Sequence, residues 1–429
     1  MEQNNRVVVT GMGAVTALGH TLDETFDRLC AGVSGIREVP SLKQAGFPVY
    51  IGGTVPDLDT LLDRYPDARR HHSRKLAFAC KALDDALGSA RLTTLAGLSC
   101  GLYLGVETGR VAFENTYRIF HFAGRATNRV DYREFGLRRR DLVPAAQIQN
   151  KMPCFLGRYL AVRHGISGPM LATSNACASS NYAIGEALRK LRSGRIQVAI
   201  AGSADEMIDE YMITGFSLLK ALSPNNARPE GASRPFDTRR DGFVLGEGAA
   251  MLVLETLDHA CRRGAPIVCE LAGFGATSDG EKITACQREG VWLLEAMRRA
   301  LADAGMDRDE VDYVNAHGTS TRLNDTAEVR AIASLFGDRS SRVLVNSTKS
   351  MIGHTVAAAG AIEAAVTIRS IVTGVCHPTL NLENLDPGCG LNCCPGRAVR
   401  SDLGAALSNS CGFSGANSCL AFRKYEGRP

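Results

Sequence analysis

Short apolar runs that end in small residues recur along the chain, and they restrict the folds that it can adopt. Examples are RVVVTGMG, GLYLGVETG, VAIAGSADEM, AAMLVLET, VDYVNAHGTST, RVLVNSTKS and AALSNSCGFSG. Runs of this length without alternating polar residues are typical of strands that are buried on both faces of a sheet. Because helical patterns separate them, the sequence predicts an α/β protein whose functional loops lie at the ends of its strands.

The length of 429 residues predicts two core-forming units or one duplicated unit, because single cores usually stop growing below this size. Residues 177–193 and 354–374 each follow a strand-like run, begin with a polar or reactive residue and contain few bulky side chains. They predict two related halves that meet at two buried central helices, although two unrelated buried helices would share the same short similarity. The polar stretch 258–268 contains glycine and proline, and it predicts halves spanning residues 1–260 and 261–429.

Charge and composition argue against several classes of protein. The 49 basic and 45 acidic side chains give a net charge of only +4, which does not favour a nucleic-acid binder. The N-terminus lacks a secretion pattern, and no run approaches the roughly 18 uncharged apolar residues of a membrane span, so we expect a cytoplasmic protein. Cys389, Cys393 and Cys394 lack the paired spacing of a zinc site, and no metal is expected there.

One of the fourteen cysteines lies in a context that is typical of a nucleophile. Cys177 lies between the strand-like PMLATSN and the helical segment 177–193. Its sulfur is therefore expected at a helix N-terminus, where backbone N–H groups and the helix dipole favour the thiolate. A buried structural cysteine is the alternative interpretation.

Two histidines and a lysine follow other predicted strands. His317 lies in NAHGTST, and His354 begins the second small-residue helix. A sulfur nucleophile with two histidines suits a reaction that develops negative charge on a thioester carbonyl. Lys349 shares the loop of His354 and is expected to form a buried ion pair with Glu363, because a buried charge needs a partner. A solvated surface lysine is the alternative.

A glycine-rich segment and a basic segment complete the candidate features. Residues 408–417 (SNSCGFSGAN) could bring backbone N–H groups close to a substrate oxygen, or they could form a plain turn. Residues 69–75 (RRHHSRK) form a basic cluster that could attract an acidic protein, or they could form a solvated helix face.

Taken together, these features resemble the β-ketoacyl-acyl-carrier-protein synthases of fatty acid elongation and the related ketosynthases of polyketide pathways. The resemblance rests on motifs in the family's order: VVVTGMGAVTALG, NACASSNYAIGEAL, SRPFDTRRDGFVLGEGA, NAHGTSTRLND, STKSMIGHTVAAAGAIE and SNSCGFSGAN. It implies a thiolase-like fold with duplicated halves in a five-layered α/β/α/β/α arrangement. It also implies a dimer, either of identical chains or with a chain-length-factor-like subunit.

The resemblance implies a role for each catalytic candidate. Cys177 would accept the acyl group, and His317 and His354 would assist decarboxylation of a malonyl group and stabilise the developing oxyanion. Lys349 would order the site together with Glu363. The reaction would be a decarboxylative Claisen condensation that forms a β-ketoacyl-acyl carrier protein. The substrates would arrive on the phosphopantetheine of acyl carrier protein, and no metal or organic cofactor would be needed.

The resemblance also implies roles in substrate and carrier binding. The backbone N–H groups of Cys177 and Phe413 would form the oxyanion hole, and the Phe413 ring would act as a gate. Thr319 and Thr321 would bind the pantetheine arm. Arg74 and Lys75 match carrier-contacting positions at the start of a helix, although a pantetheine thioester could also arrive on coenzyme A.

Departures from the family pattern concern the substrate rather than the reaction class. They are Arg322, Cys411, Ser414, Ala416 and the wording of residues 276–290. Cys411 superficially resembles the second catalytic cysteine of a thiolase, but the histidine of NAHGTST favours the decarboxylating branch. A non-catalytic chain-length factor would lack the nucleophilic cysteine, which is present here. Fatty acid elongation and a specialised polyketide or polyene pathway both remain open, as does the acyl chain length.

Overall fold

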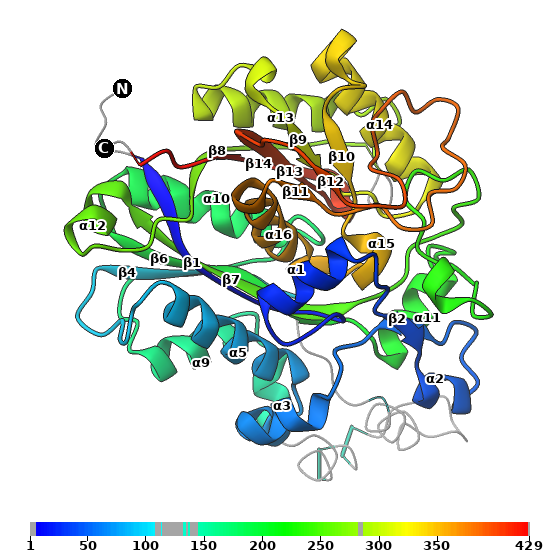
Figure 1. Ribbon diagram of the computed structural model, residues 1–429. Helices are drawn as coiled ribbons and strands as arrows, with labels where there is room; N and C mark the ends of the chain where they lie inside the picture. Colours follow the sequence, from blue (N-terminus) through cyan, green and yellow to red (C-terminus); the bar gives the residue numbers. More distant parts are fainter. Residues whose placement is uncertain are drawn as a thin grey trace.

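The computed structural model describes residues 6–107, 145–281 and 286–427, together with Phe113, Tyr132, Arg133, Gly136 and Leu137. Its centre is a ten-stranded mixed sheet with the order β10-β9-β13-β14-β8-β1-β7-β6-β4-β5 (Figure 1). The strands are β1 (Val7–Val15), β4 (Cys100–Gly105), β5 (Met170–Thr173), β6 (Val198–Glu206), β7 (Glu247–Thr256), β8 (Cys269–Ser278), β9 (Tyr313–Asn315), β10 (Leu344–Asn346), β13 (Ala405–Cys411) and β14 (Ala416–Arg423). β1 is buried along its whole length, as its unbroken apolar run predicted.

The ten strands form two halves with the same topology. In the half β5-β4-β6-β7-β1, the first two pairs are parallel and the last two are antiparallel. The half β10-β9-β13-β14-β8 repeats this order and these directions. When the five strands of each half are numbered by their order in the chain, they lie side by side in the order third, second, fourth, fifth and first. The strands β1 and β8 join the two half-sheets through a short antiparallel contact. The repeated topology confirms the predicted duplication.

Helices occupy three layers around these two half-sheets (Figure 1). α10 (Ser179–Arg192) and α16 (Ala359–Thr373) lie in the centre, and each contacts strands of both halves. The outer layers contain α5 (Arg74–Ser89) and α9 (Phe155–His164) on the first half, and α13 (Val291–Ala304) with α14 (Arg322–Phe336) on the second. The result is the predicted five-layered α/β/α/β/α arrangement.

The two central helices are equivalent elements of the duplicated fold. Each connects the third and fourth strands of its half-sheet. Their small residues allow close packing: a Cβ atom on Gly185 would lie 2.3 Å from the ring of Phe274, and one on Gly360 would lie 2.3 Å from Asn181 Oδ1. The alternative of two unrelated buried helices is therefore wrong.

One segment of the described chain, Val356–Thr373, is long and apolar enough to cross a membrane by composition alone. The sequence analysis did not anticipate it, because the segment contains Glu363 and Arg369. Its residues are 83% buried, and they form α16 with the turn before it. Burial between the two half-sheets accounts for this apolar composition.

Shorter elements complete the fold. The helices are α1 (Leu22–Cys30), α2 (Pro40–Gln44), α3 (Leu58–Arg64), α4 (Asp67–Arg70), α8 (Ala145–Asn150), α11 (Glu210–Leu218), α12 (Leu257–Arg262) and α15 (Lys349–Ile352). Two small sheets pair β2 (Ile36–Glu38) with β3 (Ile51–Gly53) and β11 (Val375–Cys376) with β12 (Val399–Arg400). Single 3-10 turns include Phe413–Gly415 between β13 and β14.

Candidate active site

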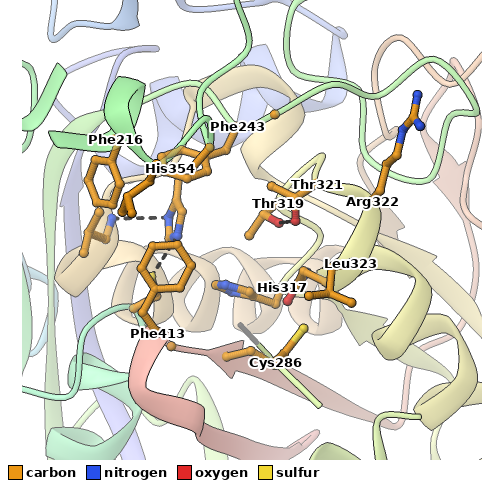
Figure 2. A pocket seen from close by; sticks show the side chains of 18 of the residues that line it. Phe216, Phe243, Cys286, His317, Thr319, Thr321, Arg322, Leu323, His354 and Phe413 are labelled. Atoms are coloured by element: carbon orange, nitrogen blue, oxygen red, sulfur yellow. Dashed lines mark hydrogen bonds between the residues drawn. The ribbon is translucent and has the colours of Figure 1, made fainter. Parts of the chain in front are cut away.

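A cavity of about 450 Å³ lies where loops from both halves meet at strand ends. β5 leads to Cys177, β9 to His317, β10 to His354 and β13 to Phe413. All four line the cavity, and so do Thr319 and Thr321 (Figure 2). The structure therefore brings together candidates that lie up to 236 positions apart in the chain, as the positions after predicted strands led us to expect.

Cys177 lies in a tight turn between β5 and α10. Ala176 has a φ of +48°, a left-handed conformation that costs about 1–3 kcal/mol for a residue with a side chain. Ser179 supports this turn, because its hydroxyl donates to the Ala176 carbonyl at 2.6 Å and accepts from the Asn175 N–H at 2.8 Å. The cysteine side chain is thereby held two residues before the first residue of α10.

His354 is in direct contact with the nucleophile. Its Nε2 lies 3.0 Å from Cys177 Sγ, and its Nδ1 accepts from the Val356 N–H at 3.3 Å. A neutral imidazole has one donor and one acceptor nitrogen. The acceptor at Nδ1 therefore places the proton on Nε2, which points this donor at the sulfur.

His317 is oriented by the ion pair of Lys349 and Glu363. Lys349 Nζ lies 3.2 Å from His317 Nδ1, donates to the His317 carbonyl at 2.7 Å and forms a buried ion pair with Glu363. Because an ammonium can only donate, Nδ1 accepts and Nε2 carries the proton. The rings of His317 and His354 lie edge to face, 5.2 Å apart.

The electrostatics of the site favour two neutral histidines. Burial, reinforced by the Lys349 charge, holds the pKa of both His317 and His354 well below the ordinary value of 6.5. Both rings therefore act as neutral hydrogen-bond donors at neutral pH. Burial also raises the pKa of Glu363 to about 7, although its ion pair with Lys349 opposes this shift.

The structure corrects the expectation that a helix N-terminus makes the Cys177 thiol acidic. Burial raises the pKa of Cys177 to about 12, although Lys349 and the backbone N–H groups of Phe413 and Cys177 favour the thiolate. Desolvation is the larger effect because the sulfur is almost completely enclosed. The two backbone N–H groups point at the sulfur, and they are positioned to bind an oxyanion that forms on an attached acyl group.

The cavity wall combines hydroxyl groups with aromatic rings. Thr319 Oγ1 and Thr321 Oγ1 lie 2.9 Å apart on one side (Figure 2). On the other side the ring of Phe413 lies 6.1 Å from that of Phe216, which in turn lies 5.1 Å from that of Phe243. The sequence analysis missed Phe216 and Phe243, because single phenylalanines in α11 and before β7 give no local signal of convergence.

A buried glutamate supports the loop of His317 and was also missed. Glu328 in α14 accepts from the N–H groups of His317 and Gly318, both at 2.8 Å, and from Asn409 Nδ2 at 3.2 Å. The only sequence signal was an acidic residue nearly two helix turns inside the segment that follows NAHGTST. This carboxylate fixes the backbone that presents His317 to the cavity.

Arg74 and Lys75 lie at the start of α5, and their expected carrier-docking role stays a prediction. Lys75 is buried, and its Nζ donates to the Glu107 carbonyl at 2.7 Å. Arg74 forms an ion pair of 2.8 Å with the buried Glu247 and donates to the Ile208 carbonyl at 3.0 Å. Lys75 is therefore not a free surface charge, whereas the Arg74 side chain remains 34% exposed beside its ion pair.

Departures from the family pattern cluster at the cavity. Cys411, Arg322 and a further cysteine, Cys286, all line it. Burial holds the pKa of Cys411 well above its ordinary value, and the nearby Glu328 charge acts in the same direction. This thiol therefore stays protonated at neutral pH. Residues 282–285 of the divergent segment lie outside the described residues.

Within the described ranges, one group of side chains has the spacing of metal ligands. Its members are Cys177, His317 and His354, whose ligand atoms lie within 4.8 Å of one another. The direct Nε2–H···Sγ hydrogen bond and the Lys349 contact with Nδ1 already explain this arrangement. The geometry is thus that of a hydrogen-bonded cluster of side chains.

Comparison with known proteins gives matches along nearly the whole chain. A family model described as β-ketoacyl synthase, N-terminal domain, matches residues 4–260, and one described as β-ketoacyl synthase, C-terminal domain, matches residues 268–383. A 3-oxoacyl-(acyl-carrier-protein) synthase 2 of Synechocystis sp. is 37% identical and covers 99% of this chain and 99% of its own. The enzyme of the same description from Staphylococcus aureus is 36% identical over 99% and 100% of the two chains.

Solved structures agree with this assignment. A chain of a type II polyketide ketosynthase in complex with its acyl carrier protein is 29% identical, with a TM-score of 0.87 over 99% of this chain and 100% of its own. A chain of the ishigamide ketosynthase/chain length factor is 30% identical, with a TM-score of 0.84 over 98% and 100%. With its thiolase-like duplicated fold, this chain belongs to the β-ketoacyl synthase family of condensing acyltransferases.

Proposed function

We propose that this chain condenses an acyl group, held as a thioester on Cys177, with malonyl-acyl carrier protein. The proposal rests on one observation: the sulfur is 3.0 Å from His354 Nε2 in a cavity that His317 shares. Neutral Nε2–H donors and two backbone N–H groups surround the place where charge develops on a thioester. The products are a β-ketoacyl-acyl carrier protein and carbon dioxide.

The first step transfers the acyl group to the enzyme. Cys177 Sγ attacks the thioester carbonyl, and the N–H groups of Cys177 and Phe413 bind the resulting oxyanion. The carbon–sulfur bond to the carrier then breaks, and the thiol proton passes to the departing pantetheine sulfur. The high pKa of the free thiol means that the thiolate must form within this step rather than exist beforehand.

The second step generates the carbon nucleophile. The thioester oxygen of the malonyl group accepts hydrogen bonds from Nε2–H of His317 and His354. These donors stabilise the enolate that forms when the carbon–carbon bond to the carboxylate breaks and carbon dioxide leaves. The enolate carbon attacks the acyl group, and the Cys177 sulfur leaves as a thiolate that regains a proton. No metal or free cofactor takes part in these bond changes.

The hydroxyl groups of Thr319 and Thr321 are proposed to bind the pantetheine arm. They line the same cavity as the nucleophile and lie 2.9 Å from each other. Hydroxyl groups can both donate to and accept from the amides of such an arm. The relatives' names, 3-oxoacyl-(acyl-carrier-protein) synthases, support an acyl carrier protein as the bearer of both substrates.

Two pathways fit this reaction. The curated relatives, at 36–37% identity, favour elongation of fatty acyl chains. The type II polyketide and ishigamide ketosynthases, with TM-scores of 0.87 and 0.84, favour a specialised polyketide or polyene pathway with a chain-length-factor-like partner. Turnover of saturated acyl-carriers by the chain alone would identify the first pathway. Turnover that requires a partner subunit would identify the second.

The open edge of the sheet supports assembly into a dimer. Among the described strands β5 pairs only with β4, and it exposes the side chains of Met170 and Leu171. Exposed apolar edge strands tend to pair with another chain. We therefore propose a homodimer, or a heterodimer with a related subunit, formed through β5. Leu171→Lys should shift the sedimentation coefficient towards that of a single chain, and an unchanged value would remove β5 from the interface.

Two further expectations stand as proposals. The boundary between the halves at residues 260 and 261 agrees with the gap between the family models, which end at 260 and begin at 268. A cytoplasmic location agrees with the bacterial relatives, although two of the plant relatives are described as chloroplastic. Fractionation of the native cell would test the location.

Alanine variants of the two histidines test the proposed mechanism. His317→Ala and His354→Ala should lower the rate of condensation by about 10²- to 10⁴-fold, because each removes a donor to the enolate. Acylation of Cys177 by an acyl-carrier should be affected much less. Radiolabelled malonyl-carrier measures the first activity and intact mass measures the second. Wild-type turnover of malonyl-carrier by either variant would contradict the assigned role.

A further inference from the structure

A pair of thiols outside the active site is not explained by the condensation reaction. Cys389 Sγ and Cys393 Sγ lie 3.6 Å apart, and both side chains are buried. The neighbouring Cys394 belongs to a different hydrophobic cluster. The sequence analysis considered all three only as zinc ligands. The structure instead separates one close dithiol from a single buried thiol.

The two thiols differ in their readiness to ionise. Either sulfur can donate in the contact between them. With Cys393 as the donor, this hydrogen bond lowers the pKa of Cys389, whereas the same hydrogen bond and burial raise the pKa of Cys393. Cys389 is therefore the sulfur that ionises first, and Cys393 is the thiol that stabilises it. This asymmetry matches an attacking and a resolving cysteine, and the attacking Cys389 is the less buried of the two, at 6% exposed against 2% for Cys393.

The chain around Cys389 permits the movement that a disulfide requires. The sulfur atoms must approach from 3.6 Å to about 2 Å. Gly388 and Gly390 flank Cys389, both are exposed, and a Cβ atom on Gly390 would meet nothing within 4 Å. The backbone beside Cys393 is attached to the sheet, because the carbonyl of the adjacent Asn392 accepts from the Val345 N–H of β10 at 2.8 Å.

We propose that Cys389 and Cys393 form a redox-modification site, at which a peroxide converts the two thiols into a reversible intramolecular disulfide. The Cys389 thiolate attacks one peroxide oxygen, the O–O bond breaks, and a sulfenic acid and water form after proton uptake. The Cys393 thiol then attacks this sulfenic sulfur and releases a second water. Two thiols are oxidised, one peroxide is reduced, and a dithiol reductant reverses the change.

A chain of hydrogen bonds connects this site to the wall of the active-site cavity. The Cys389 N–H donates to the Asp386 carbonyl at 2.7 Å, and the Asp386 carboxylate lies 2.9 Å from Arg240 Nη1. Arg240 is buried and donates to the carbonyls of Thr321 at 3.3 Å and Arg322 at 3.4 Å. Thr321 and Arg322 both line the cavity. Displacement of Cys389 therefore moves the support of the proposed pantetheine-binding wall.

Oxidation should consequently change KM for the substrate more than it changes kcat. Coupling through such a contact network commonly changes an equilibrium constant by about two- to thirtyfold. We expect KM for an acyl-carrier to rise within this range, while kcat changes little because the contacts of Cys177 with His354 are not involved. This kinetic consequence rests on the proposed function, whereas formation of the disulfide does not.

The chemical test uses Cys177→Ala protein, because peroxide would also oxidise the catalytic sulfur. After treatment with hydrogen peroxide, the intact mass should fall by about 2 Da and return on reduction. Peptide mapping should find Cys389 joined to Cys393. The loss should disappear in Cys389→Ser and Cys393→Ser backgrounds and persist in the matched control Cys394→Ser. A cross-link elsewhere, an unchanged mass, or the same loss in Cys389→Ser would overturn the proposal.

The kinetic test uses enzyme whose Cys177 is protected as its acyl thioester during peroxide treatment. KM should rise and should recover after reduction, and the Cys393→Ser enzyme should show no change. A disulfide that forms at full yield without a change in KM would overturn the connection to the cavity wall. If the reduced enzyme fails to condense at all while the disulfide still forms, the proposed function is wrong and the redox site stands.

Discussion

Lys349 contacts both its ion-pair partner Glu363 and His317, which we propose to be catalytic, so its removal has two separable effects. Lys349→Met should destabilise the fold by about 3–5 kcal/mol, because it leaves the Glu363 charge buried without a partner. It should also slow condensation, because His317 Nδ1 loses the donor that places the proton on Nε2. Urea unfolding and malonyl-carrier turnover measure the two effects.

The double variant Lys349→Met/Glu363→Gln separates the effect of Lys349 on stability from its effect on the condensation rate. It removes the unpaired charge, so much of the lost stability should return while condensation stays slow and acylation of Cys177 persists. Recovery of the condensation rate together with stability would show that Lys349 has only a structural role.

His377 provides a pH-dependent test of the buried network behind the site. Its Nδ1 donates to the Pro378 carbonyl at 2.9 Å, and its Nε2 lies 3.1 Å from the Thr348 hydroxyl. Burial lowers the pKa of His377 from 6.5 to about 4. Between these pH values the unfolded chain binds a proton that the folded chain does not. Stability should therefore fall as the pH falls from 6.5 to 4, by about 3 kcal/mol for this residue.

The His377→Gln variant should reduce this pH dependence. The slope of the unfolding free energy against pH, measured with urea between pH 6.5 and 4.5, should decrease by up to about 1.4 kcal/mol per pH unit. The slope is the informative quantity, because the substitution itself also changes stability. A variant with the wild-type slope would show that His377 is protonated in the folded protein.

At the scale of single residues, the sequence predicted which residues lie at the site better than it predicted the surroundings of their side chains. Cys177, His317 and His354 follow predicted strands. The carboxyl ends of parallel strands lie at the same edge of a sheet, so the residues that follow them come close together. The pKa of Cys177 could not be predicted, because desolvation depends on side chains brought in from other segments. For the same reason Arg74 and Lys75 appeared to be a free basic cluster, whereas the fold supplies Glu247 and the Glu107 carbonyl as their partners.

At the scale of elements, close packing of the central helices yields a direct prediction. Gly360→Ala in α16 should destabilise the protein by about 1–3 kcal/mol, because the new Cβ would lie 2.3 Å from Asn181 Oδ1 of α10. Gly88→Ala in α5 is the matched control, since nothing lies within 4 Å of its Cβ. The control should be neutral or slightly stabilising, as alanine favours helix formation. Equal effects of the two changes in thermal unfolding would contradict this account of the interface.

The central helices and buried strands were predictable because their composition is set by burial on all sides. A small-residue helix after an apolar strand has few places in a fold other than between two sheets. Phe216 and Phe243 on the aromatic side of the cavity were not predictable, because α11 and the loop before β7 show no pattern that links them, whereas Phe413 was predicted. The support of the His317 loop by Glu328 likewise depends on the position of α14.

At the scale of the whole molecule, duplication explains why one site needs both halves. The first half supplies Cys177 through β5 and α10, and the second supplies both histidines, Lys349 and Phe413. The Cys177 sulfur and its own N–H group belong to the first half, while its other hydrogen-bond partners, His354 and the Phe413 N–H group, belong to the second. The sequence predicted this division from two similar helices, while the matching strand order became visible only in the folded protein.

The central claim is that Cys177 becomes acylated and that malonyl-acyl carrier protein then consumes the acyl group. Intact-mass analysis with peptide mapping, performed on enzyme incubated with an acyl-carrier, tests it most directly. The account predicts one acyl adduct on Cys177, its disappearance when malonyl-carrier is added, and the appearance of a β-ketoacyl-carrier. Cys177→Ala should show no adduct, whereas Cys411→Ser should behave like the wild type. An adduct on another cysteine, or one that persists in the presence of malonyl-carrier, would contradict the account.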